Sequence, residues 1–245
     1  MYSVRRFLQK KVDFAPRRRY NGGMRYLRKK FAAFPVYEWL EIGLMLCLAG
    51  GFLDAYTFVT RGGVFANAQT GNMILLAIGL AGGDGLRALR YLVPILFFFA
   101  GVFLSELLLR LGKKTRGDFR GHGFVLAAEI AVLIVVGFLP ADVPDMLVNA
   151  LVSFAAAVQF DNFRRLEGKP FATAFCTGNL RSATEHVFHG VVEKQKGAIR
   201  TAGKYFAVIL AFIGGVTAGY FASRALGGYA ALIAAGVLLL VLAAI

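Results

Sequence analysis

Residues Gly50–Met73 read GGFLDAYTFVTRGGVFANAQTGNM, an apolar run broken by an aspartate, a glycine pair and a polar triplet. The aspartate is Asp54, the glycines are Gly62 and Gly63, and the triplet is Thr70–Asn72, at the head of a second apolar run. An ionisable residue inside a membrane costs at least ~2.5 kcal/mol on insertion scales, so it marks a candidate functional site. The stretch therefore predicts a membrane helix with a functional carboxyl group, followed by a break.

The same features recur later in the chain at one constant shift. Asp161 lies 107 positions after Asp54, and Thr177–Asn179 lies 107 positions after Thr70–Asn72 (161 minus 54 and 177 minus 70). Weak internal similarity of this kind is how duplicated halves show themselves in membrane proteins. We therefore expect residues 38–140 and residues 141–245 to form two related membrane repeats.

The composition is typical of an integral membrane protein. Hydrophobic residues make up 58% of the 245 residues, and several apolar runs approach the roughly 20 residues that a bilayer-spanning helix needs. The formal net charge is +14, but the basic residues lie in the N-terminal arm and in loops between apolar runs. Orientation in a membrane explains this distribution better than nucleic-acid binding does, so we expect no nucleic-acid partner.

The N-terminal arm, residues 1–37, is a separate basic segment. Its first 35 residues carry eleven Lys or Arg, interleaved with aromatic residues. It lacks the continuous apolar core and the small-residue cleavage site of a secretory signal peptide. Two interpretations stay open. The arm either binds anionic lipid, at ~1 kcal/mol per cation near the surface, or only keeps this end of the chain in the cytoplasm.

Six apolar segments are expected to span the membrane, and two shorter segments are not. The segment after the first triplet, Met73–Gly82, has ten residues and reaches only about half of the hydrocarbon thickness. The segment after the second triplet, Leu180–Val192, has apolar residues at helical spacing among charged ones and is typical of an amphipathic helix. The expected spans are Glu38–Val59, Tyr91–Leu109, Phe124–Leu139, Met146–Phe163, Tyr205–Ala222 and Tyr229–Ile245.

The loop charges favour six crossings over eight. With eight, the loop Arg110–His122, which holds five Lys or Arg, would lie outside, and Ala141–Asp145, with two aspartates and no cation, would lie inside. Both placements oppose the positive-inside tendency. With six, the N-terminus, the five-cation loop and the C-terminus face the cytoplasm, and the two halves run in opposite directions. The expected fold is an all-α polytopic bundle of six spanning helices and two short half-helices. It forms a 3+3 inverted-topology repeat, as many secondary transporters do.

The motifs of both halves resemble those of a known family. GGFLDAYTFVTRGGVFANAQTGN in the first half and VQFDNFRRLEGKPFATAFCTGNLRSA in the second are similar to the YoaK-like family of bacterial inner-membrane proteins, which is catalogued as a domain of unknown function. The resemblance extends roughly from Glu38 to the C-terminus. It implies a bacterial membrane protein of six or seven helices, often suggested to be a transporter, with no established substrate.

The two aspartates are the candidate coupling residues. Counted along the expected spans, Asp54 lies roughly 22 Å from the cytoplasmic edge of a ~30 Å core, and Asp161 lies at a similar distance from the outer edge. Desolvation favours the protonated form of a carboxyl group, so either residue could exchange a proton. The alternatives are a hydrogen bond between helices or a cap at a helix end. For Asp161, a further alternative is an ion pair with Arg164 or Arg165.

Each polar triplet predicts the start of a short helix. Its threonine can cap, its glycine allows close approach of the backbone, and its asparagine offers a donor and an acceptor. A buried helix N-terminus favours an anionic ligand, although capping and tight packing without a ligand explain the motif equally well. Asn67 and Gln69 could line the same cavity. The expected solute- or ion-binding set is Asp54, Asn67, Gln69, Thr70, Gly71, Asn72, Asp161, Thr177, Gly178 and Asn179.

Two further features are interpreted as structural. Glu129 lies inside an expected span and has no counterpart in the other half, where position 236 is glycine. Gly215 and Gly219 form a GxxxG motif, which packs helices closely, either within the chain or in a homodimer.

The sequence carries no nucleotide-binding loop, metal-ligand cluster or nucleophile motif, so we expect neither enzyme activity nor a cofactor or metal. The leading hypothesis is a multi-pass transporter of an unspecified small solute in the inner (cytoplasmic) membrane, coupled to protons through its intramembrane aspartates. A passive channel would share the repeat but would need no titrating carboxyl group. A non-transporting scaffold or sensor would act through the basic arm.

Overall fold

The computed structural model describes residues 33–112, 118–140, 142–171 and 176–245. By its internal contacts the chain divides into two compact units, Met1–Pro35 and Val36–Ile245. The helical bundle is formed by the second unit. Almost the whole basic arm falls on residues 1–32, so the expectation that it binds anionic lipid lies outside the described residues.

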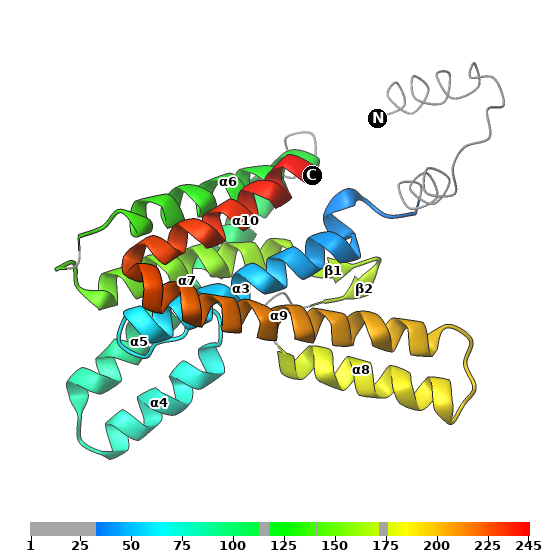
Figure 1. Cartoon of the computed structure of the whole chain (residues 1–245), viewed down its shortest axis with the longest axis horizontal. Coiled ribbons are helices and arrows are strands. Elements are labelled where there is room, and N and C mark those ends of the chain that lie inside the picture. Colours follow the sequence, from blue (N-terminus) through cyan, green and yellow to red (C-terminus); the bar gives the residue numbers. More distant parts are fainter. Residues whose placement is uncertain (1–32, 113–117, 141, 172–175) are drawn as a thin grey trace. The chain divides into compact units, whose positions relative to one another are not determined.

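The described part of the second unit is helical apart from one small hairpin, in which β1 (Arg165–Leu166) pairs antiparallel with β2 (Lys169–Pro170). Two short 3-10 turns, η1 (Val36–Glu38) and η2 (Gly227–Ala230), precede the first and the last helix. The helices, labelled in Figure 1, are α3 (Leu40–Thr60), α4 (Gln69–Ala81), α5 (Gly85–Gly112), α6 (Asp118–Gly137), α7 (Asp145–Asn162), α8 (Cys176–Val191), α9 (Ala198–Leu226) and α10 (Ala231–Ala244).

The end of α3 follows from its glycines. The helix is 21 residues long and apolar over most of its length. The chain leaves it through Gly62 and Gly63, both at positive φ, 77° and 75°. Glycine adopts this left-handed backbone at no steric cost, so the pair ends the helix and turns the chain back.

The helices pack in a pattern that is the same for the two halves of the chain. α3 packs on α9 as α7 packs on α5, and α4 packs on α5 as α8 packs on α9. Likewise α6 packs on α7 as α10 packs on α3, while α6 and α10 also pack on each other. Each helix of the first half therefore has a counterpart in the second, in the order α3 with α7, α4 with α8, α5 with α9 and α6 with α10. When every helix is replaced by its counterpart, each of these helix pairs becomes another pair that is also in contact, or the same pair again. This is the contact symmetry that a duplication would produce.

The two main helix crossings bring backbone against backbone through glycine. A Cβ atom on Gly215 would collide with the carbonyl oxygen of Leu48, and one on Gly219 would lie 2.6 Å from the carbonyl oxygen of Phe52. At the matching crossing of α5 with α7, a Cβ atom on Gly101 would lie 2.6 Å from the carbonyl oxygen of Phe154. The GxxxG motif of α9 is therefore occupied by α3 of the same chain.

Each short helix forms a hairpin with the long helix that follows it. A Cβ atom on Gly79 of α4 would lie 3.0 Å from the backbone nitrogen of Ala88, and one on Gly190 of α8 would lie 3.2 Å from that of Ile199. Both contacts join residues nine positions apart, and α4 and α8 begin 107 positions apart, at Gln69 and Cys176. In Figure 1 the tips of the two hairpins point to opposite ends of the unit.

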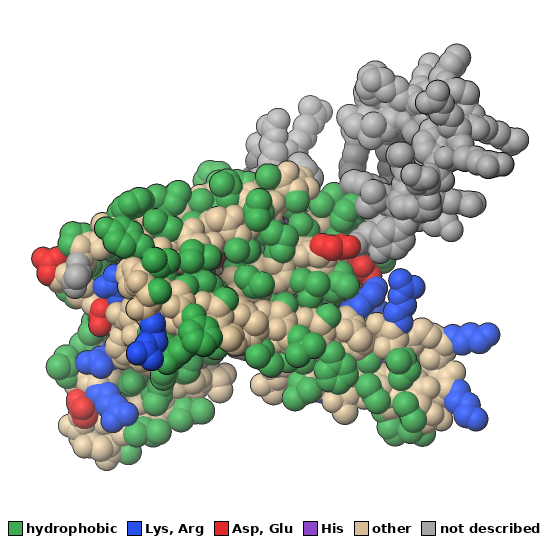
Figure 2. Space-filling model, viewed as in Figure 1, with side chains coloured by type: hydrophobic (Ala, Val, Ile, Leu, Met, Phe, Trp, Pro, Cys, Tyr) green, Lys and Arg blue, Asp and Glu red, His purple; other side chains and the backbone are tan. Residues whose placement is uncertain are grey.

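The surface of the unit is apolar in the manner of a membrane protein. Large hydrophobic side chains face outward along the helices, including Phe99, Phe221 and Leu240, each more than 60% exposed. In Figure 2 hydrophobic side chains cover the middle of the visible face, and the charged side chains lie toward its two ends. Three stretches of the described chain are long and apolar enough to cross a membrane, and the third contains both α9 and α10. They are Leu40–Thr60, Gly85–Leu108 and Ala198–Ala244.

Candidate functional site

The loop between α3 and α4 folds back into the bundle and is bonded to Asp54. The Asp54 side chain is only 3% exposed, and its Oδ1 atom accepts a hydrogen bond of 2.6 Å from the backbone N–H of Asn67. The N–H groups of Ala66 and Ala68 also interact with this carboxyl group. A carboxylate that receives several backbone N–H groups can hold a loop as a helix cap does.

One amide side chain sets the depth to which the loop returns, and a second bonds within the loop. The side chain of Asn67 donates to the carbonyl oxygen of Gly50 at 3.1 Å, and that of Gln69 donates to the carbonyl oxygen of Ala66 at 2.9 Å. Gly50 lies ten residues before Thr60, the last residue of α3, which corresponds to about 15 Å along the helix axis. The chain thus leaves α3 at its end and begins α4 at the level of its middle.

In the first polar triplet, the asparagine closes the loop. Asn72 accepts a hydrogen bond from the N–H of Phe65 at 3.0 Å and donates to the carbonyl oxygen of the same residue at 2.7 Å. It also donates to Gln69 at 2.9 Å. Gly71 leaves room for the Phe65 ring, which would lie 2.8 Å from an added Cβ atom. Thr70 is exposed and is not the cap residue, which is Ala68.

The second triplet lies at the start of α8 in the same register. Asn179 is buried as Asn72 is, whereas Thr177 and Gly178 are exposed. Cys176 begins the helix and lies within electrostatic range of Asp54. The structure therefore brings Asp54, the loop before α4 and the beginning of α8 into one region.

One oxygen of Asp54 is left over in this arrangement. Its Oδ2 atom is buried and has no hydrogen-bond partner among the described residues. A buried acceptor without a partner costs about 1–3 kcal/mol, and more when it is charged. Asp54 can therefore bind a proton, or a donor group of a ligand, without giving up its bond to the loop.

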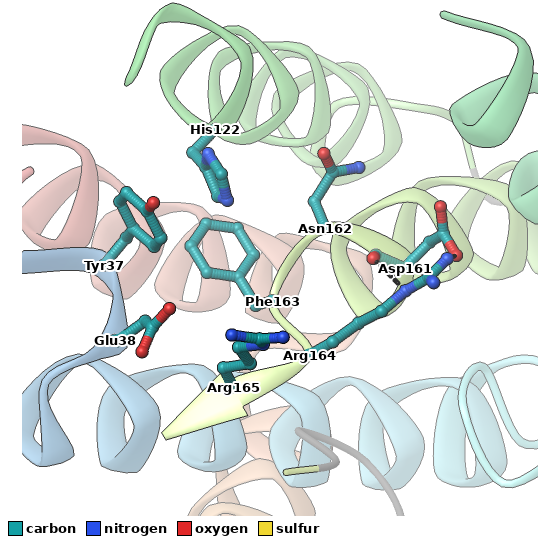
Figure 3. A pocket seen from close by; sticks show the side chains of 8 residues that line it. All are labelled: Tyr37, Glu38, His122, Asp161, Asn162, Phe163, Arg164 and Arg165. Atoms are coloured by element: carbon teal, nitrogen blue, oxygen red, sulfur yellow. Dashed lines mark hydrogen bonds and ion pairs between the residues drawn. The ribbon is translucent and has the colours of Figure 1, made fainter. Parts of the chain in front are cut away.

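Asp161 lies elsewhere, in an ion-pair cluster at the end of α7 (Figure 3). Its side chain is buried, and its Oδ1 atom is paired with Arg164. The same guanidinium group bonds to Glu106 of α5 at 2.5 Å. The alternative in which Arg164 neutralises Asp161 is thus the one that the structure shows.

A pocket of about 240 Å³ lies beside Asp161, where α3 and α6 begin and α7 ends. Within it His122 stacks on Tyr37, with ring centroids 4.0 Å apart. Figure 3 shows that its lining comes from three separate parts of the chain, namely Tyr37, Glu38, His122, Asp161, Asn162, Phe163, Arg164 and Arg165. Asp54 does not line this pocket, since it lies fourteen residues into α3, about 21 Å from the start of that helix.

Two sets of polar contacts at the ends of α3 were not expected from the sequence. At one end of α3, Arg61 pairs with Asp145 at 3.5 Å, and Asn149 donates to the carbonyl oxygen of Arg61 at 2.8 Å. At the other end, Glu38 accepts from the N–H of Glu167 at 2.7 Å through its carbonyl oxygen and from that of Gly168 at 2.9 Å through its carboxylate. Both sets of contacts join an end of α3 to residues of the second half.

Apolar helices with outward-facing hydrophobic side chains, and buried polar groups bonded within the bundle, define a helical integral membrane protein. The chain belongs to the family described as protein of unknown function (DUF1275), which matches residues 42–245. A relative is the UPF0700 transmembrane protein YoaK of Bacillus subtilis (strain 168). It is 25% identical over 178 residues, which cover 70% of this chain and 79% of that protein. No solved structure matches. The resemblance to a YoaK-like family is thereby confirmed.

Proposed function

We propose that this protein is a secondary transporter of a small solute in the inner membrane, with its N-terminus in the cytoplasm. The single observation that carries the proposal is the site around Asp54. A loop returns to the middle of α3, a short helix starts there, and a buried carboxyl group keeps one oxygen without a partner. Discontinuous helices of this kind form the substrate and ion sites of many transporters.

An inverted repeat of six spans and two half-helices accounts for the packing. α4 has 13 residues and α8 has 16, about 20 and 24 Å, and neither length bridges a ~30 Å hydrocarbon core. α10 has 14 residues, but it continues the four-residue turn η2, and together they reach about 29 Å. The contacts of one half have counterparts in the other, and the hairpins of the two short helices point to opposite ends of the unit (Figure 1). Two halves inserted in opposite directions would produce this arrangement.

Transport would then follow from rocking of the two halves around the region of Asp54. The start of α8 belongs to the second half and approaches Asp54 of the first, so a movement between halves changes the surroundings of the free oxygen. In one state the oxygen would face water on one side of the membrane, and in the other state it would face water on the opposite side. A solute with a donor group would bind to it in competition with a proton.

The test uses purified protein reconstituted into liposomes. The vesicles are incubated with a deproteinised bacterial metabolite extract under an imposed pH gradient, and the accumulated solutes are identified by mass spectrometry. We expect at least one solute to accumulate in a gradient-dependent manner, and Asp54→Asn to abolish that accumulation. Asp142→Asn, at an exposed position in the loop before α7, is the matched control and should behave as the wild type does.

Three outcomes would oppose the proposal. Accumulation that ignores the pH gradient and never exceeds equilibrium would indicate a passive channel. No enrichment over empty liposomes, with either direction of the gradient, would refute transport of any solute in the extract. A protein whose cellular function is lost on removal of residues 1–35 and unchanged by Asp54→Asn would be a scaffold or sensor.

A further inference from the structure

Glu129 is the most isolated carboxyl group of the bundle. Its side chain is 2% exposed, and neither Oε1 nor Oε2 has a hydrogen-bond partner among the described residues. Asp54, by comparison, has one oxygen bonded to the loop, and Asp161 is paired with Arg164. Glu129 therefore lies inside the protein without a hydrogen bond or an ion pair to any residue that the structure describes.

The position belongs to a row of α6 that is otherwise apolar. Leu126, Leu133 and Val136 fall at helical spacing on either side of Glu129, and all three are fully buried. They belong to the hydrophobic core that α6 shares with α3, α7 and α10. A leucine at position 129 would continue this row, so packing does not require a carboxyl group there.

The depth of Glu129 is that of the other polar groups in the bundle. It lies eight residues before the end of α6, and Ser153 lies eight residues after the start of α7, so each is about 12 Å from that end of its helix. The two helices pack together, and the hydroxyl of Ser153 is also buried without a partner among the described residues. Asp54 lies six residues before Thr60, the last residue of α3. At this end of α3, Arg61 pairs with Asp145 of α7.

Few charges face Glu129 from the elements around it. The sequence of α10 has no titratable residue, and Tyr229 of η2 is 59% exposed. α7 carries its acidic residues at its two ends, Asp145 paired with Arg61 and Asp161 paired with Arg164.

Charges on α3 and at the start of α6 are also distant or engaged. On α3, Glu41 is exposed near the beginning of the helix and Asp54 is bonded to the loop. The buried Tyr56 of α3 accepts a hydrogen bond from Arg61 at 3.4 Å through its hydroxyl group. On α6 itself, His122 stacks on Tyr37 seven residues away. No cation of the described residues is therefore placed to neutralise Glu129.

We propose that Glu129 is an intramembrane proton-binding site, and that it carries a second coupling proton, besides that of Asp54, in the transport proposed above, on which this second part rests. An ionised carboxylate without partners is not tolerated in an apolar interior, so the closed bundle described here holds Glu129 as the neutral acid. A proton taken from water on one side adds to a carboxylate oxygen, and it leaves to water on the other side when the halves move and wet the site. A costly polar group that packing does not need is retained for such a role.

Labelling tests the proton site independently of any solute. A fluorescent carbodiimide adds to protonated carboxyl groups in apolar surroundings, and mass spectrometry locates the adduct in reconstituted protein. We expect an adduct on Glu129 that becomes weaker as the pH rises and that is absent in Glu129→Gln. Glu193→Gln, which removes an exposed carboxyl group, is the matched control and should leave the labelling of Glu129 unchanged. Absence of an adduct on Glu129 at every pH would overturn the proposal.

Stability distinguishes a proton site from a structural carboxyl group. Because Glu129 lacks partners, Glu129→Leu should raise the melting temperature of the purified protein and Glu129→Gln should leave it nearly unchanged. A fall in melting temperature for both variants would mean that the carboxyl group holds the fold together, and would overturn the proposal.

Transport assays separate this inference from the proposed function. If both hold, Glu129→Gln loses gradient-driven accumulation of the solute found with the wild type, while exchange of that solute across the vesicle membrane continues. If Glu129→Gln still concentrates the solute, Glu129 does not carry a coupling proton. If the wild type moves no solute but Glu129 is labelled in a pH-dependent manner, the transport function fails and the proton site stands.

Discussion

Two neighbouring glycines of α9 should respond in opposite ways to the same substitution. Gly214 has no atom within 4 Å of the place where a Cβ atom would be, whereas a Cβ atom on Gly215 would overlap the backbone of Leu48. Gly214→Ala adds a methyl group to open space, and Gly215→Ala adds it at the crossing of α3 with α9. We therefore expect the first variant to be as stable as the wild type or more so, and the second to be less stable.

The size of the effect can be worked out from the two terms involved. Alanine is favoured over glycine in a helix by about 1 kcal/mol, and this gain is common to both variants. Overpacking of a tight interior costs about 1–3 kcal/mol. At Gly215 the obstacle is a backbone carbonyl, which no change of rotamer can move. The difference between the variants should therefore be about 2 kcal/mol, or roughly 4–8 °C in melting temperature for a chain of this size.

The assay can use a reporter that the protein already contains. Cys47 of α3 is 1% exposed, so a thiol-reactive dye reaches it only when the crossing of α3 with α9 opens. Cys176→Ala removes the second thiol, and dye fluorescence is then followed during heating in detergent. If Gly215→Ala and Gly214→Ala melt at the same temperature, backbone contact does not hold the crossing, and the reasoning is wrong.

Two further predictions concern the loop and the topology. Asn72→Ala leaves the N–H and carbonyl groups of Phe65 without their partner, so it should lower the free energy of unfolding by about 1–3 kcal/mol in a denaturant titration. Thr70→Ala, at an exposed position, should change it little. Equal effects of the two variants would mean that the bonds between Asn72 and Phe65 do not stabilise the loop. A single cysteine at position 116 of a cysteine-free variant should react with an impermeant thiol reagent only from the cytoplasmic side, and one at position 142 only from outside. Labelling of position 116 from outside would rule out six spans.

The positions of the helices could be predicted from the sequence because the apolar runs and the glycine and polar residues between them indicate the same boundaries. The triplets Thr70–Asn72 and Thr177–Asn179 lie in the first turns of α4 and α8, as expected, although each helix begins one residue earlier. The long helices extend further than the expected spans, since α5 starts at Gly85 and α9 at Ala198. Their added turns carry Arg and Lys, which end a hydropathy signal but not a helix, because long basic side chains can reach the membrane surface.

The site was only partly accessible from the sequence. Asp54 and Asn72 could be singled out because a charge or an amide is unusual in an apolar run. The bond from the Asn67 N–H to Asp54 could not, because every residue but proline offers a backbone N–H group. The pairing of Arg61 with Asp145 joins residues 84 positions apart, and only the packing of α3 and α7 against each other shows that they meet. For Glu129 the sequence favours a structural role, because its isolation is a property of its neighbours in space.

The shortness of α4 exposes the site to the properties of the bilayer. Irregular backbone cannot face lipid tails, and the loop before α4 satisfies this rule because Val64, Ala66 and Asn67 are buried. The outer side of α4, with Ile74 and Ile78 about half exposed, meets lipid over only part of the membrane's depth. A thicker or thinner bilayer must be accommodated by tilting or by local deformation, at fractions of a kcal/mol per Å. Since α4 begins at the loop anchored on Asp54, we expect membrane thickness to affect the geometry of that carboxyl group.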